Sequence, residues 1–203
     1  LGGNIGTPLF DRIADIRPDD FAVLELSSFQ LHGMHCAPDV AIITNISPNH
    51  LDVHPDLEDY VSAKCSIYRG QRPDGVLVLN AKDAHTPRFA AEAPGSVRYF
   101  SSVGPVENGV YCSDGVIYRA HGGKAEKLID VSDIRIPGAH NVENYMAAFA
   151  ATDGLVGQAA CVQVARSFAG VPHRMERIRE LNGITFINDS IASSPTRTIA
   201  GLH

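Results

Sequence analysis

Apolar runs of strand length recur in the first half of the chain. Residues 21–26, 40–44 and 75–79 are almost continuously hydrophobic. An unbroken apolar run, unlike strict alternation, is typical of a strand covered on both faces, as in a parallel sheet. Between the second and third runs, the apolar side chains of 57–68 recur at helical spacing. Strand, helix and strand in this order predict a βαβ crossover and an α/β sheet.

The rest of the chain continues with regular segments of both kinds. These are a weaker helix at 84–93, a strand at 97–100, helices at 141–152 and 159–168, and a hairpin over 175–187 that turns at Asn182-Gly183. Residues 103–136 alternate short β-type segments with glycine turns. The pattern predicts an α/β fold with a mostly parallel central sheet, flanked by helices and carrying a small antiparallel β excursion.

Composition and charge exclude several classes of protein. The 203 residues, 44% hydrophobic and 20% charged, are typical of a globular protein with room for one ordinary domain. A net charge of −6 without a cluster of Lys and Arg argues against nucleic acid as a partner. No apolar run approaches the roughly 20 residues of a membrane span, and no secretory signal is visible. The four scattered cysteines predict free thiols, so we expect a cytoplasmic protein.

Polar side chains follow two of the predicted strands. Glu25, Ser27 and Gln30 come at the end of the first, and Asn45 and His50 follow the second. In open parallel sheets, ligands bind where the carboxyl ends of the strands meet. A carboxylate and an imidazole there can share a Mg²⁺ ion, which needs few protein ligands besides phosphate and water. The alternative, that Glu25 is an ordinary solvated or hydrogen-bonded carboxylate, stays open.

Five other polar residues have both a functional and a structural interpretation. Lys64 lies on the apolar side of its predicted helix, where it either faces inward or extends its ammonium to solvent. Asn141 and Asn144 share one face at a helix start, and capping alone would explain the first. Arg174 lies in a loop and Asp189 ends a strand, and either can be a turn residue. Spacing alone therefore indicates an α/β protein of nucleotide-binding type and goes no further.

Sequence motifs add a resemblance. Residues 24–31 (LELSSFQL) look like the signature of the D-glutamate-adding members of the Mur ligase family, and 44–52 (TNISPNHLD) resemble a segment shared across that family. The resemblance continues, in family order, through 63–68, 138–144, 172–176 and 187–190. The ordered set spans essentially the whole chain and is therefore more specific than any single motif.

The resemblance implies an ATP-dependent ligase of peptidoglycan precursor synthesis. Such an enzyme adds D-glutamate to UDP-N-acetylmuramoyl-L-alanine through an acyl phosphate, with Mg²⁺ as cofactor, and acts as a monomer. The implied residues are Glu25 and His50 as metal ligands; Lys64, carbamylated by CO₂, with His50 and Arg174 in catalysis; Asn4, Ser27 and Gln30 at the UDP-muramoyl substrate; and Asn141, Asn144, Arg174 and Asp189 at ATP.

The chain also departs from the family pattern. The phosphate loop, G-x-x-x-x-G-K followed by Ser or Thr, does not occur, and Ile191 stands where many relatives carry Lys. We therefore expect 1–190 to be a central ATP-binding domain without its phosphate loop, 191–203 to begin a C-terminal domain, and the chain alone to be inactive.

Two alternative functions remain from the sequence. One is a sister ligase that adds another residue or makes folate polyglutamate, against which 26–30 (LSSFQ) argue. The other is a non-catalytic module that holds a nucleotide sugar. Glu25, His50 and Lys64 argue against this second alternative, because pure binding needs no metal cluster.

Overall fold

The computed structural model describes residues 1–4, 6, 8–47, 54–192 and 198–199. These residues belong to two compact units: the first comprises Leu1–Ala41, Asn45–Leu77 and Pro87–Ser96, and the second Ile42–Thr44, Val78–Thr86 and Val97–His203. Among the helices of the described residues, none combines the length and hydropathy of a membrane span.

A sheet of six strands confirms the α/β class and the mostly parallel arrangement. Its hydrogen-bonded order is β3 (Val40–Ile43), β4 (Val76–Asn80), β5 (Ser96–Ser101), β6 (Gly109–Ser113), β7 (Val116–His121) and β8 (Lys124–Asp130). Helices α2 (Leu57–Arg69) and α3 (Thr86–Glu92) connect β3 to β4 and β4 to β5 along the chain, which is the crossover that parallel strands require. β6 is parallel to β5, whereas β7 and β8 add the predicted antiparallel excursion.

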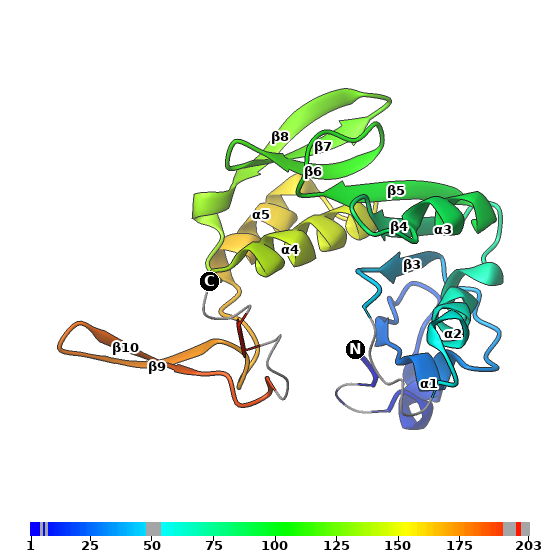
Figure 1. Cartoon of the computed structure of the whole chain (residues 1–203), viewed down its shortest axis with the longest axis horizontal. Helices are drawn as coiled ribbons and strands as arrows, with labels where there is room; N and C mark the ends of the chain where they lie inside the picture. Colours follow the sequence, from blue (N-terminus) through cyan, green and yellow to red (C-terminus); the bar gives the residue numbers. More distant parts are fainter. Residues whose placement is uncertain (5, 7, 48–53, 193–197, 200–203) are drawn as a thin grey trace. The chain divides into compact units, whose positions relative to one another are not determined.

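Two helices of the first unit pack side by side (Figure 1). The short helix α1 (Ser28–Leu31) buries Leu31, and α2 buries Val61, Cys65 and Tyr68, which recur at helical spacing. At the start of α2, the Asp56 side chain accepts the backbone N–H of Asp59. This cap satisfies one of the free donors of the first turn and explains why the helix begins there.

The first apolar run does not become a buried strand. Only Leu24–Glu25 forms a strand, β2, which pairs in parallel with β1 (Gly2–Gly3) in a separate two-stranded sheet. Phe21 is 72% exposed, so the expected burial on both faces is wrong for this run. Burial depends on what packs against a strand, which an apolar run does not itself specify. Gly3 has a φ of +99°, and a Cβ there would lie 2.2 Å from the carbonyl oxygen of Glu25, so this pairing requires glycine.

In the second unit, α4 (Ala139–Thr152) and α5 (Gln158–Ser167) lie on one face of β6–β8 (Figure 1). Met146 and Phe149 of α4 are buried, as are Val110 of β6 and Ile117 of β7. These apolar side chains form the core of this unit and hold the start of α4, which carries Asn141 and Asn144, in place.

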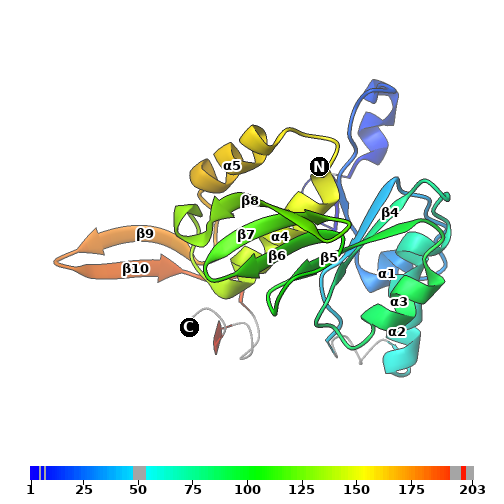
Figure 2. The same cartoon turned by 90° about the horizontal axis from the view of Figure 1, so that it is seen from above.

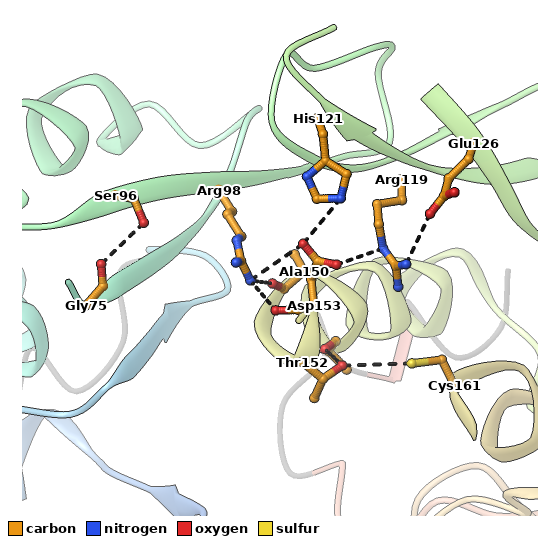
Figure 3. A network of polar contacts seen from close by, with 11 residues as sticks. Gly75, Ser96, Arg98, Arg119, His121, Glu126, Ala150, Thr152, Asp153 and Cys161 are labelled. Atoms are coloured by element: carbon orange, nitrogen blue, oxygen red, sulfur yellow. Dashed lines mark hydrogen bonds and ion pairs between the residues drawn. The ribbon is translucent and has the colours of Figure 1, made fainter. Parts of the chain in front are cut away.

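Arg98 anchors the other end of α4 (Figure 3). Its guanidinium donates to the carbonyl oxygens of Ala150 and Asp153, each at 2.9 Å. The Asp153 carboxylate in turn lies 3.1 Å from Nε of Arg119 and 3.6 Å from Nε2 of His121. The last carbonyls of a helix lack partners within it, so this cluster acts as a C-terminal cap.

The hairpin near the end of the chain forms as predicted (Figure 2). Strands β9 (Glu176–Leu181) and β10 (Ile184–Asn188) pair antiparallel. Asn182 and Gly183, at the turn, have φ values of 52° and 77°. Positive φ at both central residues is typical of the type I′ turn that suits a two-residue hairpin.

Candidate active site

The pairing of β1 with β2 brings Asn4 and Glu25 together. The side-chain amide of Asn4 donates to Oε1 of Glu25 at 3.3 Å, and its backbone N–H donates to the Glu25 carbonyl at 2.7 Å. A predicted substrate residue and a predicted metal ligand, 21 positions apart in sequence, therefore lie side by side. This contact also shows that Glu25 is a hydrogen-bonded carboxylate.

Ser27 and Gln30 form a reciprocal capping box at the start of α1. The Gln30 N–H donates to Oγ of Ser27 at 3.3 Å, and the Ser27 N–H donates to Oε1 of Gln30 at 2.9 Å. The spacing of Ser, two residues and Gln is the sequence signal for this cap. Both predicted substrate residues thus hold each other in a fixed geometry, which pre-orients them at the end of β2.

Lys64 is half-buried on α2. Burial lowers the pKa of its ammonium, an effect that the nearby Glu25 carboxylate partly opposes. Its Nζ lies 5.2 Å from the centre of the Tyr60 ring. These surroundings favour the inward-facing interpretation over extension into solvent. A lowered pKa raises the fraction of neutral amine, the form that reacts with CO₂.

His50, the other predicted metal ligand, lies outside the described residues, within 48–53. The pairing of Glu25 with His50 therefore stays a prediction. Any role of the other polar residues within 48–53 likewise stays a prediction.

The loop that carries Arg174 is tied to the end of β10. The Met175 N–H donates to Oδ1 of Asp189 at 3.0 Å, and the Ile191 N–H donates to the His173 carbonyl at 3.2 Å. His173 and Met175, on either side of Arg174, have φ values of 66° and 47°. Non-glycine residues in this left-handed region store strain, which is often found at functional sites. Arg174 and Asp189, both predicted at ATP, are thus neighbours.

Asn141 does not cap α4. The N-cap is Gly138, which offers no side chain, and the Asn141 amide instead donates to the Pro137 carbonyl at 2.6 Å. The capping interpretation is therefore wrong. Asn144 is exposed on the same first turns of the helix. Within the described residues, no hydrogen bond or ion pair links either asparagine to Arg174 or Asp189.

One polar cluster near α4 is not indicated by the sequence motifs. Oε1 of Glu143 accepts the Ser102 hydroxyl at 2.6 Å and also contacts the Lys82 ammonium. Ser102 directly follows β5, and Lys82 lies two positions after the end of β4. Their places at strand ends were the sequence signal that could have indicated this cluster. The cluster connects these strand ends to the first turns of α4.

A second unpredicted cluster surrounds His54. Its Nδ1 lies 2.6 Å from Oδ2 of Asp59, and its Nε2 lies 3.0 Å from Oγ of Ser28. With His32, the ligand atoms of His54 and Asp59 fall within 4.8 Å of one another. However, Zn²⁺ bonds of about 2.0–2.1 Å in tetrahedral geometry place ligand atoms roughly 3.3 Å apart. The 2.6 Å separation is therefore that of a hydrogen bond, and the cluster is better described as a hydrogen-bonded relay than as a metal centre.

The Mur ligase middle domain family matches residues 4–152 of this chain. The chain belongs to the Mur ligase family. Among curated relatives of this Mur ligase domain, the UDP-N-acetylmuramoylalanine–D-glutamate ligase of Acetivibrio thermocellus is 52% identical over 203 residues. That of Ruminiclostridium cellulolyticum is 49% identical over 202 residues. The match covers all of this chain but only 44% and 43% of these relatives, so the chain spans less than half their length.

Solved structures show the same fold. A crystal structure of MurF from Acinetobacter baumannii matches with a TM-score of 0.64 and 23% identity, over 85% of this chain and 38% of that one. MurF from Thermotoga maritima, in complex with ADP, matches with a TM-score of 0.59 and 20% identity, over 88% of this chain and 43% of that one. The Mur ligase domain thus has the α/β fold that its sequence pattern predicts.

Proposed function

We propose that this chain forms part of an ATP-dependent ligase that joins D-glutamate to UDP-N-acetylmuramoyl-L-alanine in peptidoglycan precursor synthesis. One observation carries the proposal: 52% identity along the whole chain to a D-glutamate ligase. The geometry at the β2–α1 junction supports the proposal. One polar group lies there at a strand end, formed by Asn4, Glu25, Ser27 and Gln30.

The proposed reaction has two steps. An oxygen of the alanyl carboxylate attacks the γ-phosphorus of ATP, the bond to ADP breaks, and an acyl phosphate forms. The amine of D-glutamate then attacks the acyl carbon and loses a proton, and inorganic phosphate leaves with the bonding electron pair. The first step brings two anions together. Arg174, which follows the strained His173 and is held near Asp189, is suited to offset that charge at the phosphates.

Lys64 and Glu25 fit a divalent-metal site. Desolvation disfavours the Lys64 ammonium, which makes its amine available for carbamylation. A carbamate would place a second anion beside Glu25, and two neighbouring anions need a cation. We propose that Mg²⁺ is held there, with His50 as a further ligand. When bound, Mg²⁺ neutralises charge on phosphate and carboxylate oxygens.

Asn141, Asn144 and Asp189 are proposed to contact the nucleotide.

We further propose that residues 1–190 form the central ATP-binding domain and that 191–203 begin a C-terminal domain. The curated relatives are more than twice the length of the matched region. The phosphate loop and the D-glutamate site are therefore proposed to be contributed by other parts of the ligase. We expect the ligase to act as a cytoplasmic monomer.

Amino-acid-dependent phosphate release tests the function. A full-length protein containing this chain is incubated with ATP, Mg²⁺ and UDP-N-acetylmuramoyl-L-alanine, and then with D-glutamate, L-glutamate, L-lysine or D-alanyl-D-alanine. We expect release with D-glutamate alone. Release with another amino acid would indicate a sister ligase. Sugar nucleotide binding without release under any condition would indicate a binding module.

A further inference from the structure

His54 is a buried imidazole with a partner at each nitrogen. The residue is 4% exposed, and its two contacts reach Asp59 on α2 and Ser28 on α1 at 2.6 and 3.0 Å. Ser28, 26 positions away in sequence, is 3% exposed. One side chain therefore links the start of α1 to the first turn of α2. The hydrogen bond to Ser28 is buried, where such bonds are stronger than on the surface, whereas the one to Asp59 is only part-buried.

The chemistry of the partners defines the direction of each hydrogen bond. The Asp59 carboxylate can only accept, so Nδ1 of His54 carries the proton. In a neutral ring Nε2 is then an acceptor, and the Ser28 hydroxyl donates to it. Asp59 lies in the first turn of α2, where the helix dipole favours negative charge. The relay from Ser28 through His54 to Asp59 is thus fully satisfied.

A serine hydrogen-bonded to a histidine, which is in turn hydrogen-bonded to an aspartate, is also the arrangement of a hydrolase triad. The burial of this relay, however, argues against nucleophilic catalysis. In a hydrolase the serine oxygen must reach a substrate carbonyl. With Ser28 and His54 both almost fully buried, no substrate approaches that hydroxyl. The relay can therefore act on the reaction only by holding other residues in place.

The residues it holds belong to the β2–α1 junction on one side and to α2 on the other. Ser28 directly follows Ser27, the cap residue of α1, and lies three positions after Glu25. On the other side, the His54 ring meets the Tyr60 ring edge-on at 5.3 Å between centroids. The Tyr60 ring in turn lies 5.2 Å from Nζ of Lys64. A continuous chain of contacts thus runs from the β2–α1 junction through His54 to Lys64.

We infer that His54 is a positioning residue that holds Lys64 and the segment from Glu25 to Gln30 in the relative geometry that the ligase reaction needs. The inference rests on the proposed function and adds a residue that acts through others. It predicts an effect on the sugar-nucleotide side of the reaction, because His54 contacts Ser28, the neighbour of Ser27, and Tyr60, the neighbour of Lys64. Among the described residues, its hydrogen bonds and ring contacts include none of those proposed at ATP.

The test uses a full-length protein and steady-state kinetics. His54→Phe keeps an aromatic ring beside Tyr60 but removes both hydrogen bonds. We expect kcat to fall about 10- to 100-fold, the scale on which small misplacements act. We also expect KM for UDP-N-acetylmuramoyl-L-alanine to rise and KM for ATP to stay within about twofold. His32→Phe is the matched control, since it replaces an exposed imidazole whose ring centre lies 6.2 Å from that of His54, and it should behave like the wild type.

A second pair of variants separates positioning from folding and remains informative if His54→Phe fails to fold. Asp59→Asn retains an oxygen that accepts the Nδ1 proton, whereas Asp59→Ala does not. We expect Asp59→Asn to keep most of the activity and Asp59→Ala to lose about tenfold in kcat at a temperature where both variants are folded. Equal and near-normal kcat in both Asp59 variants, or in His54→Phe, would overturn the inference. A wild-type protein that releases no phosphate with D-glutamate would instead overturn the proposed function, together with what rests on it.

Discussion

The backbone N–H of Met175 donates to Oδ1 of Asp189 over 3.0 Å, which fastens the loop that carries Arg174 to the end of β10. Because Met175 has a φ of 47°, the loop conformation is strained and needs such an external tie. One oxygen of Asp189 is therefore engaged in shaping the site. The residue that accepts from Met175, directly after Arg174, is thus one that sequence resemblance assigns only to the nucleotide.

Replacing Asp189 tests this tie. In Asp189→Ala the Met175 N–H loses its acceptor, and hydrogen bonds to charged groups are worth about 1.5–3 kcal/mol. We expect KM for ATP to rise roughly 10- to 100-fold, since about 1.4 kcal/mol corresponds to a factor of ten. Asp189→Asn keeps an acceptor oxygen and should show the smaller effect. A KM for ATP in Asp189→Ala equal to that of the wild type would show that the tie does not position Arg174.

Ser27 caps helix α1 and is also proposed to contact the substrate. Two substitutions distinguish the structural role from the binding role. Ser27→Ala removes the side chain that accepts the Gln30 N–H, so we expect a loss of about 1 kcal/mol in stability and a higher KM for the sugar nucleotide. Ser27→Asp keeps a capping oxygen but adds negative charge near an anionic substrate. It should retain the melting temperature and still raise KM. If Ser27→Asp left KM unchanged, Ser27 would have only its structural role.

Lys64 is expected to act as an anion once carbamylated. Lys64→Ala should be nearly inactive and should regain part of its activity when short carboxylic acids are added, because a small carboxylate can occupy the space of the carbamate. Lys64→Arg is the control: it keeps the positive charge and fills the space, so it should be inactive and not rescued. Phosphate release measured with and without formate or acetate gives the answer. Full activity of Lys64→Ala without additive would remove the carbamate from the mechanism.

The lowered pKa of Lys64 also predicts how stability depends on pH. Below the folded-state pKa the amine is protonated in both states, and the folded protein bears the desolvation cost of the ammonium. Between that pKa and the unfolded value of about 10.4, the unfolded state binds more protons, so stability rises with pH. Lys64→Met should therefore gain more stability relative to the wild type at pH 7 than at pH 10. Thermal denaturation in CO₂-free buffer measures this difference, and an equal gain at both pH values would contradict it.

Gly109 starts β6 at a point where no side chain fits. Its φ is +132°, and a Cβ would lie 1.9 Å from the carbonyl oxygen of Tyr99 on β5. Gly104 has a similar φ of +138° but no atom within 4 Å of such a Cβ. We expect Gly104→Ala to cost about 1–3 kcal/mol through backbone strain alone. Gly109→Ala should cost distinctly more, because the carbonyl belongs to the β5–β6 pairing. Equal shifts in melting temperature would show that the strands adjust freely.

Local sequence determined the order and type of most elements of this Mur ligase domain. The helical spacing in 57–68 predicted α2 to within one residue at its end, and Asn182-Gly183 predicted the hairpin turn. Both signals are local: side-chain periodicity follows from helix geometry, and a two-residue turn needs residues that tolerate positive φ. The ordered motifs likewise indicated the family that the comparisons then showed.

Only the tertiary structure decided which of these segments meet. No periodicity in the sequence reveals that Phe21 is exposed. Nor does it reveal the relay from Ser28 through His54 to Asp59, or the hydrogen bond between Met175 and Asp189. The last two depend on contacts that span 26 and 14 positions of the chain. Such contacts arise when separate elements pack, and their geometry follows from the burial and hydrogen bonding of all the groups involved. For that reason His54 could be recognised as more than an ordinary histidine only after α1 and α2 were seen side by side.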